Sequence, residues 1–269
     1  MIIDAHVHAG KGDLLTAPWN TSAPIEPYLR RARAAGIDRS IIFAPFHTDY
    51  AHANQQTARI VARYPHRLIG FAFINTRADA GRIFEMVRQA VTQLGLRGIK
   101  LHGTEGMPNR ELCEAAQAFR LPVIVDVVGR GETVEMFASE YPQVNFIIPH
   151  FGSFADDWRA QQRVVDQLVR FPNVYADTSG VRRFDYILQA VRRAGAHKIL
   201  FGSDGPWLHP GLELYKIRLL RLPADQEKLI LGGNALRLLR QTLTETEAES
   251  ANNPFLASVR LPPTNRNAN

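Results

Sequence analysis

The chain has 269 residues, of which 45% are hydrophobic and 22% are charged, and it contains a single cysteine. These proportions are ordinary for a globular protein and argue against a disordered chain. One cysteine cannot form an intramolecular disulfide, which excludes a disulfide scaffold and a multi-cysteine zinc finger. The sequence lacks an apolar run of roughly 18 residues, as a membrane span would need, and it does not open on a secretory signal. We therefore expect a cytoplasmic protein with no membrane partner.

The chain carries 32 Lys and Arg against 26 Asp and Glu, a formal net charge of +6, and nearly all of the positive charge is arginine. These arginines are scattered through helix-like segments. A nucleic-acid-binding protein more often gathers its basic residues into one stripe with interleaved aromatic residues. We therefore expect a solvated basic surface and no nucleic-acid partner.

Short β-branched apolar runs alternate with longer amphipathic segments along most of the chain. The predicted strands are Ile2–Val7, Arg39–Ala44, Leu68–Ile74, Gly98–His102, Pro122–Val127, Asn145–Pro149, Val174–Asp177 and Lys198–Gly202. The predicted helices are Pro27–Ala35, Ala51–Tyr64, Ala80–Leu94, Arg110–Phe119, Glu132–Tyr141, Asp157–Phe171, Phe184–Ala194 and Gly211–Arg240. Several strands are continuous apolar runs, as expected for parallel strands that are buried on both faces. Eight such units predict an α/β fold, a single (β/α)8 TIM barrel, with a doubly wound open sheet as the competing architecture.

The barrel is expected to occupy residues 1–241 as one domain. Residues 242–269 form a polar C-terminal tail rich in Thr, Glu, Ser, Asn and Pro, which we expect to be ordered only in part. Scattered apolar residues in the tail, such as Phe255 and Leu261, offer contacts to the barrel or to a second subunit. A homodimer is therefore a prediction for the assembly.

Ligand-type side chains recur at the carboxyl ends of the predicted strands, where a barrel carries its chemistry. His6 and His8 alternate on the first strand, so both imidazoles face one side, as two ligands of one metal would. Further side chains of this kind stand at or near other strand ends, namely Lys100, His102, Asp126, His150, Asp177 and Asp204. A lone histidine at a strand end is more often a hydrogen-bonded structural residue, but this recurrence favours a metal or catalytic centre.

With these residues in place, the chain resembles the amidohydrolase superfamily. The closest resemblance is to the amidohydrolase-2 branch, which includes aminocarboxymuconate-semialdehyde decarboxylase, resorcylate-type decarboxylases and several lactonases. The segments that carry the resemblance follow the family order and are Ile3–His8, Gly98–His102, Pro149–Gly152, Leu200–Pro206 and Ile230–Ala235. Each motif alone is weak, but their joint order covers nearly the whole predicted barrel.

The resemblance implies a site for one divalent metal held by His6, His8 and Asp204. A histidine on the fifth strand normally completes this ligand set, but here that segment ends in Asp126. Zinc is the first expectation, and because a carboxylate is a harder ligand than imidazole, manganese and magnesium are the alternatives. An Asp126-ligated metal is the preferred interpretation, ahead of a site that binds metal weakly and of an inactive site.

The leading hypothesis for the function is a metal-dependent hydrolase that acts on an ester, lactone or amide through a metal-activated water. In this hypothesis Asp204 shuttles a proton, and His150 polarises the carbonyl on which charge develops. The alternative within the same family is a non-oxidative decarboxylase of a small aromatic or unsaturated carboxylic acid. A catalytically impaired barrel that only binds a ligand is the second alternative.

The expected partner is a small molecule. The cationic side chains near the predicted site indicate that this molecule is anionic. Lys100 and His102 would form one wall of its site. Arg130 and Arg182 follow strand ends and could clamp a carboxylate, although each is equally well explained as a surface residue. Trp19 in the first loop, together with Phe46 and Trp207, could line an apolar pocket, although each is equally well explained by packing.

Overall fold

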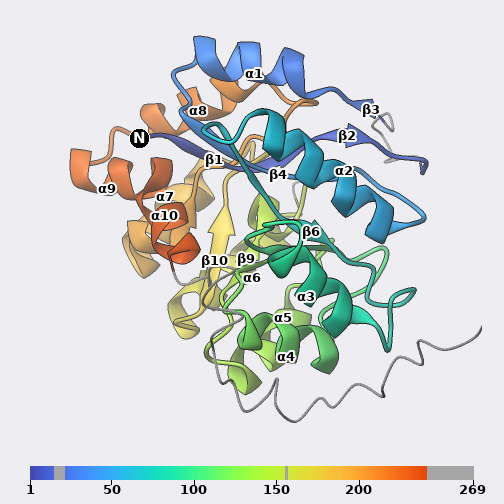
Figure 1. Ribbon diagram of the computed structural model, residues 1–269. Coiled ribbons are helices and arrows are strands. Elements are labelled where there is room, and N and C mark those ends of the chain that lie inside the picture. Colours follow the sequence, from blue (N-terminus) through green and yellow to red (C-terminus); the bar gives the residue numbers. More distant parts are fainter. Residues whose placement is uncertain (15–21, 155–156, 241–269) are drawn as a thin grey trace, which may run out of the picture.

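The structure is a computed structural model that describes residues 1–14, 22–154 and 157–240. The predicted tail, and Trp19 in the first loop, lie outside these ranges. Parallel strands form the centre of the fold, and helices surround them on the outside (Figure 1). Within the described ranges, no helix combines the length and apolar character needed to span a membrane.

Nine short strands of the described chain build the barrel. They are β1 (Ile3–His8), β4 (Arg39–Phe43), β5 (Leu68–Gly70), β6 (Ala72–Phe73), β7 (Ile99–His102), β8 (Val123–Asp126), β9 (Phe146–Ile148), β10 (Val174–Asp177) and β11 (Ile199–Leu200). The hydrogen-bonded orders are β1-β4-β5 and β11-β10-β9-β8-β7-β6. β5 and β6 are two halves of one predicted strand, and they flank Phe71, whose N–H donates to the Ile42 carbonyl at 2.9 Å. The two sheets are therefore continuous at this point, and β5 and β6 together count as one barrel strand.

Backbone hydrogen bonds also join the first and last strands. The N–H of Ala5 donates to the Phe201 carbonyl at 2.8 Å, and the N–H of Asp204 donates to the His6 carbonyl at 2.8 Å. Val7 and Gly205 form a parallel bridge in the same seam. These contacts close the eight-stranded parallel barrel, which confirms the predicted (β/α)8 fold over the open-sheet alternative.

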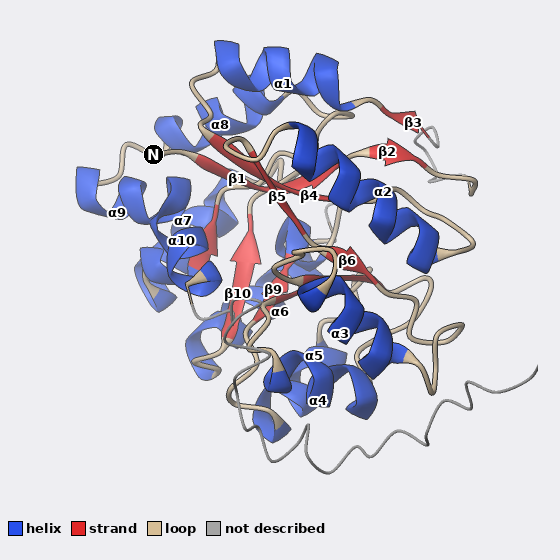
Figure 2. Ribbon diagram, viewed as in Figure 1, coloured by secondary structure: helices blue, strands red, loops and turns tan. Residues whose placement is uncertain are grey.

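Helices follow the strands as the periodicity predicts (Figure 2). They are α1 (Ile25–Ala34), α2 (Tyr50–Arg63), α3 (Ile83–Thr92), α4 (Arg110–Ala118), α5 (Glu132–Glu140), α6 (Trp158–Arg170), α7 (Phe184–Ala194), α8 (Pro210–Leu219), α9 (Ala224–Lys228) and α10 (Asn234–Leu239). Short antiparallel strands β2 (Gly10–Lys11) and β3 (Ser22–Ala23), which the sequence pattern did not predict, pair in the first loop.

The prediction of one helix over residues 211–240 is wrong. The segment divides into α8, α9, a π-helical turn at Leu229–Gly233 and α10. Arg221 takes a left-handed conformation with φ of 49° just after α8, and Pro223 precedes α9. A left-handed residue ends a helix and proline cannot continue one, so both interrupt the pattern despite suitable apolar spacing.

Apolar side chains alternate between the inside and the outside of the barrel. Ile41, Phe43, Ile124 and Ile147 belong to one buried cluster with members on every barrel strand except β7. That cluster fills the barrel, because only the interior is shared by all the strands. Residues at the intervening positions, such as Val125, join a second cluster beneath the helices.

Candidate metal and catalytic site

Three predicted metal ligands come together at the seam that closes the barrel. His6 and His8 lie on β1, whose pairing with β4 shifts register between Asp4 and Val7, and Asp204 follows β11. Asp204 Oδ1 is 3.5 Å from Nε2 of His6 and 3.5 Å from Nε2 of His8. One ligand atom from each residue lies within 4.8 Å of the other two, and all three residues are buried.

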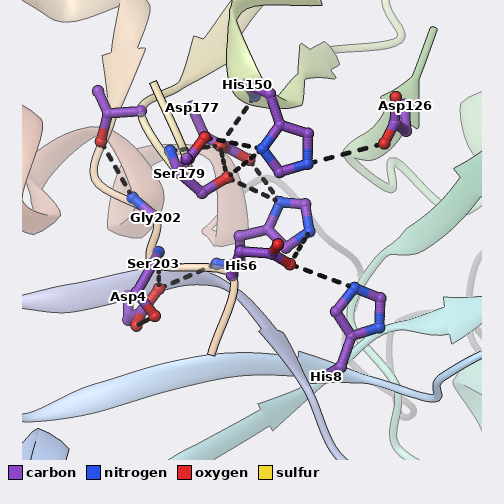
Figure 3. Close-up of polar contacts among 12 residues, drawn as sticks. Asp4, His6, His8, Asp126, His150, Asp177, Ser179, Gly202 and Ser203 are labelled. Atoms are coloured by element: carbon purple, nitrogen blue, oxygen red, sulfur yellow. Dashed lines mark hydrogen bonds and ion pairs between the residues drawn. The ribbon is translucent and has the colours of Figure 1, made fainter. Parts of the chain in front are cut away.

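The far nitrogens of the two imidazoles are anchored, which sets the direction of the near ones. His6 Nδ1 is 2.8 Å from Asp177 Oδ2 (Figure 3). His8 Nδ1 is 3.2 Å from the Ala44 carbonyl. Since both partners accept, each Nδ1 carries the hydrogen and each Nε2 presents its lone pair toward Asp204. His6 Nε2 is fully buried and has no hydrogen-bond partner among the residues that the structure describes. An orphaned lone pair beside a second imidazole and a carboxylate fits a divalent metal ion.

Burial shifts the pKa values of His6, His8 and Asp204 in the directions that favour their neutral forms. It lowers the pKa of His6 to about 4 and that of His8 to well below its usual value, with the charge of Lys100 adding to both shifts. Burial also raises the pKa of Asp204 well above its usual range, and neighbouring carboxylates add to the rise. For Asp177, burial opposes ionisation, but the contacts with His6 prevail and hold its pKa at about 2. Neutral imidazoles are the form that binds a metal.

The backbone around the site adopts conformations that most residues avoid. Asp204 has φ of 56°, and His150 and Phe151 have φ of 57° and 49°. Non-glycine residues in the left-handed region carry strain, which tends to concentrate at functional sites. A Cβ at Gly202 would lie 3.0 Å from the His6 Cβ, so glycine lets the end of β11 approach β1.

Asp4 supports the backbone that carries Asp204. Its carboxylate accepts hydrogen bonds from the Ser203 N–H at 2.9 Å and from the Tyr28 hydroxyl at 2.8 Å. Burial raises the pKa of Asp4 to about 7, although these hydrogen bonds oppose the rise. Asp4 therefore links β1, α1 and the residue before Asp204 in one buried network.

Asp126 lies in a second polar group beside the first. Its Oδ2 is 3.3 Å from His102 Nε2 and 3.7 Å from His150 Nε2, and it is not part of the group that His6, His8 and Asp204 form. Burial alone would raise the pKa of Asp126, but His102, His150 and Lys100 hold it well below its usual value. Its role as a fourth metal ligand stays a prediction.

His150 connects the two groups. Its Nδ1 donates to the Ser179 carbonyl at 2.7 Å, and its ring centroid is 5.0 Å from that of His6. Figure 3 shows His150 between Asp126 on one side and Ser179 and Asp177 on the other. The Ser179 hydroxyl donates to Asp177, so the end of β10 orients both His6 and His150.

The residues predicted to bind substrate differ in their placement. Lys100 is buried with Nζ 4.9 Å from the centre of the Phe43 ring, and His102 is close to Asp126. Arg130 is exposed, and its Nη2 donates to the Gly103 carbonyl at 2.7 Å, which supports the end of β7. Arg182 is exposed after β10. The structure thus brings Lys100 and His102 to the centre, whereas both arginines lie on loops.

Several residues at the site had no predicted role. The sequence placed Asp177 at a strand end without assigning it a contact, and it gave no sign of Ser179 or Phe154. The Phe154 ring stands 5.1 Å from His150. Phe46 and Trp207, which the sequence offered as pocket-lining residues, do lie at the site, with the Trp207 ring 4.5 Å from His8 and the Phe46 ring 4.7 Å from His102. The signal available for these residues was their position just after strand ends, but loop conformation decides which of them turn inward.

A separate hollow of about 670 Å³ lies on the outer surface, lined by residues of α5, α6 and α7. Three of its arginines form ion pairs, namely Arg163 with Glu132, Arg170 with Glu135 and Arg193 with Asp166. It also lies on the helical exterior rather than at the strand ends. The group at the end of β1 is therefore the stronger candidate for chemistry.

Comparison with solved structures finds the same fold in enzymes of low sequence identity. A 5-carboxyvanillate decarboxylase from Sphingomonas paucimobilis is 16% identical, with a TM-score of 0.67 over 89% of this chain and 98% of that one. A dihydroxybenzoic acid decarboxylase from Polaromonas sp. JS666, with bound manganese and the inhibitor 2-nitroresorcinol, is 19% identical, with a TM-score of 0.66 over 89% and 96%. An uncharacterised TIM-barrel protein from Bordetella bronchiseptica is 20% identical, with a TM-score of 0.71 over 89% and 98%.

No curated protein matches the chain by sequence. A family model described as amidohydrolase matches residues 3–241, which is almost the entire predicted barrel and includes the three clustered ligands. This match confirms the resemblance found in the sequence motifs. The chain belongs to the amidohydrolase family.

Proposed function

We propose that the protein is a metal-dependent decarboxylase that releases carbon dioxide, without oxidation, from a small aromatic or unsaturated carboxylic acid. The observation that carries the proposal is the buried group of His6, His8 and Asp204, in which His6 Nε2 lacks a partner. The fold likeness to aromatic-acid decarboxylases supports this reaction over hydrolysis, which was the leading hypothesis from the sequence.

His6, His8 and Asp204 would hold the metal, and Asp126 remains a candidate for a fourth ligand. When bound, a divalent cation supplies an electrophilic centre that binds substrate oxygens and stabilises negative charge. Manganese gains support from the relative that contains it, and zinc suits the two imidazoles. Asp177 orients His6 in this arrangement, as carboxylates commonly do behind metal-binding histidines.

Decarboxylation needs a proton donor, because the carbon–carbon bond breaks and its electron pair stays on the substrate carbon. One proton must reach that carbon as carbon dioxide leaves. We assign this transfer to the Asp204 carboxyl group. Its Oδ1 faces the two imidazoles, whereas its other oxygen forms no hydrogen bond or ion pair with any residue that the structure describes.

His150 would orient the substrate through a hydrogen bond that its Nε2 accepts. Its Nδ1 donates to the Ser179 carbonyl, and this contact fixes the ring so that Nε2 points toward the Asp126 side. The rings of Phe46, Phe154 and Trp207 would restrict water near the reacting carbon. A planar, apolar substrate body suits these three rings.

Hydrolysis of a lactone, ester or amide is the second candidate, and the family description favours it. In that reaction Asp204 would accept a proton from the attacking water and return it to the leaving group. The residues are the same in both reactions. Only the fate of the substrate separates the two functions.

The test uses the metal-loaded protein and a panel of hydroxybenzoic acids and aromatic lactones. We expect carbon dioxide release from at least one acid and, in deuterated water, one deuterium on the vacated carbon. Asp204→Asn should abolish both signals, whereas His66→Asn, at an exposed position away from the site, should leave them unchanged. Acid release from a lactone without carbon dioxide from any acid would contradict the decarboxylase proposal and support the hydrolase.

The proposed partner is therefore a small anionic molecule rather than nucleic acid. A homodimer stays a prediction, which light scattering after size-exclusion chromatography would test. Exposed Leu212, Tyr215 and Leu219 on α8 are the first place to look for a subunit contact.

A further inference from the structure

Two lysines are buried in the barrel, and their surroundings differ. Lys198 is 3% exposed, lies over the Tyr175 ring, and donates to the carbonyls of Phe171 at 2.7 Å and Pro172 at 2.8 Å. Lys100 is 1% exposed and its Nζ lies over the Phe43 ring, but this ammonium group forms no hydrogen bond or ion pair with any residue that the structure describes. A buried ammonium without a hydrogen-bond acceptor is strongly unfavourable unless a ligand supplies one.

The direction of Lys100 follows from the strand that carries it. Its neighbours Ile99 and Leu101 belong to the apolar layer beneath the helices, so Lys100 and His102 face the barrel interior. β7 is also the barrel strand that adds no member to the interior apolar cluster. The Phe43 ring is 4.9 Å from Lys100 Nζ and 5.0 and 4.7 Å from the rings of His6 and His8, so the ammonium group and the candidate metal ligands surround the same aromatic ring.

Lys100 acts on the site carboxylates through its charge, but it forms no direct ion pair with any of them among the described residues. Asp177 is bound by His6 at 2.8 Å, Asp126 approaches His102 at 3.3 Å, and Asp204 approaches two imidazoles at 3.5 Å. Each carboxylate thus has a nearer partner, and none pairs directly with Lys100. The ammonium group therefore remains available for an anionic ligand.

We propose that Lys100 Nζ binds an anionic oxygen of the substrate that is retained in the product, either a second carboxylate or a phenolate. A cation on the leaving carboxylate would stabilise the reactant, because carbon dioxide carries no charge, and would slow its loss. A cation on a retained oxygen holds substrate and transition state alike and orients the substrate. The assignment to a retained group rests on the proposed function, because only decarboxylation removes a carboxylate. Anion binding by Lys100 does not depend on which reaction follows.

The substrate class that follows is a small planar acid with two acidic groups. The carbon that loses its carboxylate would lie beside Asp204, the assigned proton donor, and the retained acidic group would bind Lys100. The aromatic rings of Phe46 and Trp207, which flank His102 and His8, would contact the planar body between them. Lys100 is thus a residue that determines specificity for charge.

The first experiment measures binding by calorimetry to the metal-loaded protein, with isophthalate as the diacid probe and isophthalamide as its neutral counterpart. We expect Lys100→Met to weaken isophthalate binding about 10- to 100-fold, as loss of a hydrogen bond to a charged group does. Isophthalamide affinity, metal content and melting temperature should not fall. The matched control Lys198→Met should lower the melting temperature and leave isophthalate affinity unchanged.

Unchanged isophthalate binding in Lys100→Met would overturn the proposal, as would the absence of diacid binding to the unaltered protein. Loss of metal or of thermal stability without a selective loss of diacid binding would show a structural role instead. Once a decarboxylated acid is known, its product should lose affinity in Lys100→Met by the same factor as the substrate. A product that binds both proteins equally would overturn the assignment to a retained group, whereas selective diacid binding without any decarboxylation would refute only the proposed function.

Discussion

Asp177 Oδ2 lies 2.8 Å from Nδ1 of His6, although 171 positions separate the two residues in the chain. Both side chains are fully buried, and the Ser179 hydroxyl and N–H also donate to the Asp177 carboxylate. The carboxylate therefore fixes the tautomer of an imidazole whose other nitrogen has no partner. This relationship makes β10 a support for ligands carried by β1.

Asp177→Asn should weaken metal binding while preserving the shape of the site. Loss of the charge behind His6 removes electrostatic support for the ligand, and changes of this kind typically lower metal affinity about 10- to 100-fold. Competition with a chelating dye measures the affinity directly. Asp185→Asn, at a partly exposed carboxylate paired with Arg183, is the control and should bind metal as the unaltered protein does. Equal affinity in both variants would show that Asp177 does not act through His6.

Removal of a ligand should abolish stoichiometric metal. His6→Ala and Asp204→Ala each delete one member of the clustered group, and two remaining ligands hold a divalent ion poorly. Elemental analysis of the purified proteins should find about one metal ion per chain in the unaltered protein and far less in the variants. His66→Ala, at an exposed position, should retain the metal. Full occupancy in Asp204→Ala would place the metal elsewhere.

Tyr28→Phe should destabilise the barrel without changing the metal ligands. The Tyr28 hydroxyl donates to Asp4 and lies 2.7 Å from the Ser40 hydroxyl, so its loss leaves buried polar groups short of partners. We expect the free energy of unfolding to fall by about 1–3 kcal/mol. Urea denaturation followed by circular dichroism measures the change. Tyr215→Phe, at an exposed site, should change the stability by less than about 0.5 kcal/mol.

Lys198 should make stability rise with pH in the alkaline range. Burial, together with the charge of Arg237, lowers the pKa of Lys198 from 10.5 to about 8. Between these values the unfolded chain binds more protons than the folded chain, so the free energy of unfolding increases with pH. The neutral amine still has two N–H groups for its two carbonyl partners.

The comparison of unaltered protein with Lys198→Met isolates this contribution. The difference in their unfolding free energies should grow by about 1–2 kcal/mol as the pH rises from about 8 to about 10.5, a value discounted for partial solvation. Lys228→Met, at an exposed position, should show no such trend. A pH-independent difference would mean that Lys198 keeps its ordinary pKa in the folded protein.

The sequence by itself was enough to predict the barrel and the core of its site. Strand and helix periodicities are local, so the order of eight units could be recognised without tertiary information. Because parallel strands of a barrel all end at one rim, His6, His8 and Asp204 could be grouped before any distance was known. The helix over residues 211–240 failed because local turns at Arg221 and Pro223 interrupt a pattern that its apolar spacing continues.

Only the tertiary structure decided which side chains meet at that rim. A strand pattern tells which face a residue occupies, but barrel closure and loop conformation set the separation of side chains from different strands. Asp126 therefore lies between His102 and His150 instead of within the clustered group, and Asp177 stands behind His6. The same closure buries the Lys100 ammonium group against the Phe43 ring with no hydrogen-bond acceptor among the described residues, a property that no local pattern encodes.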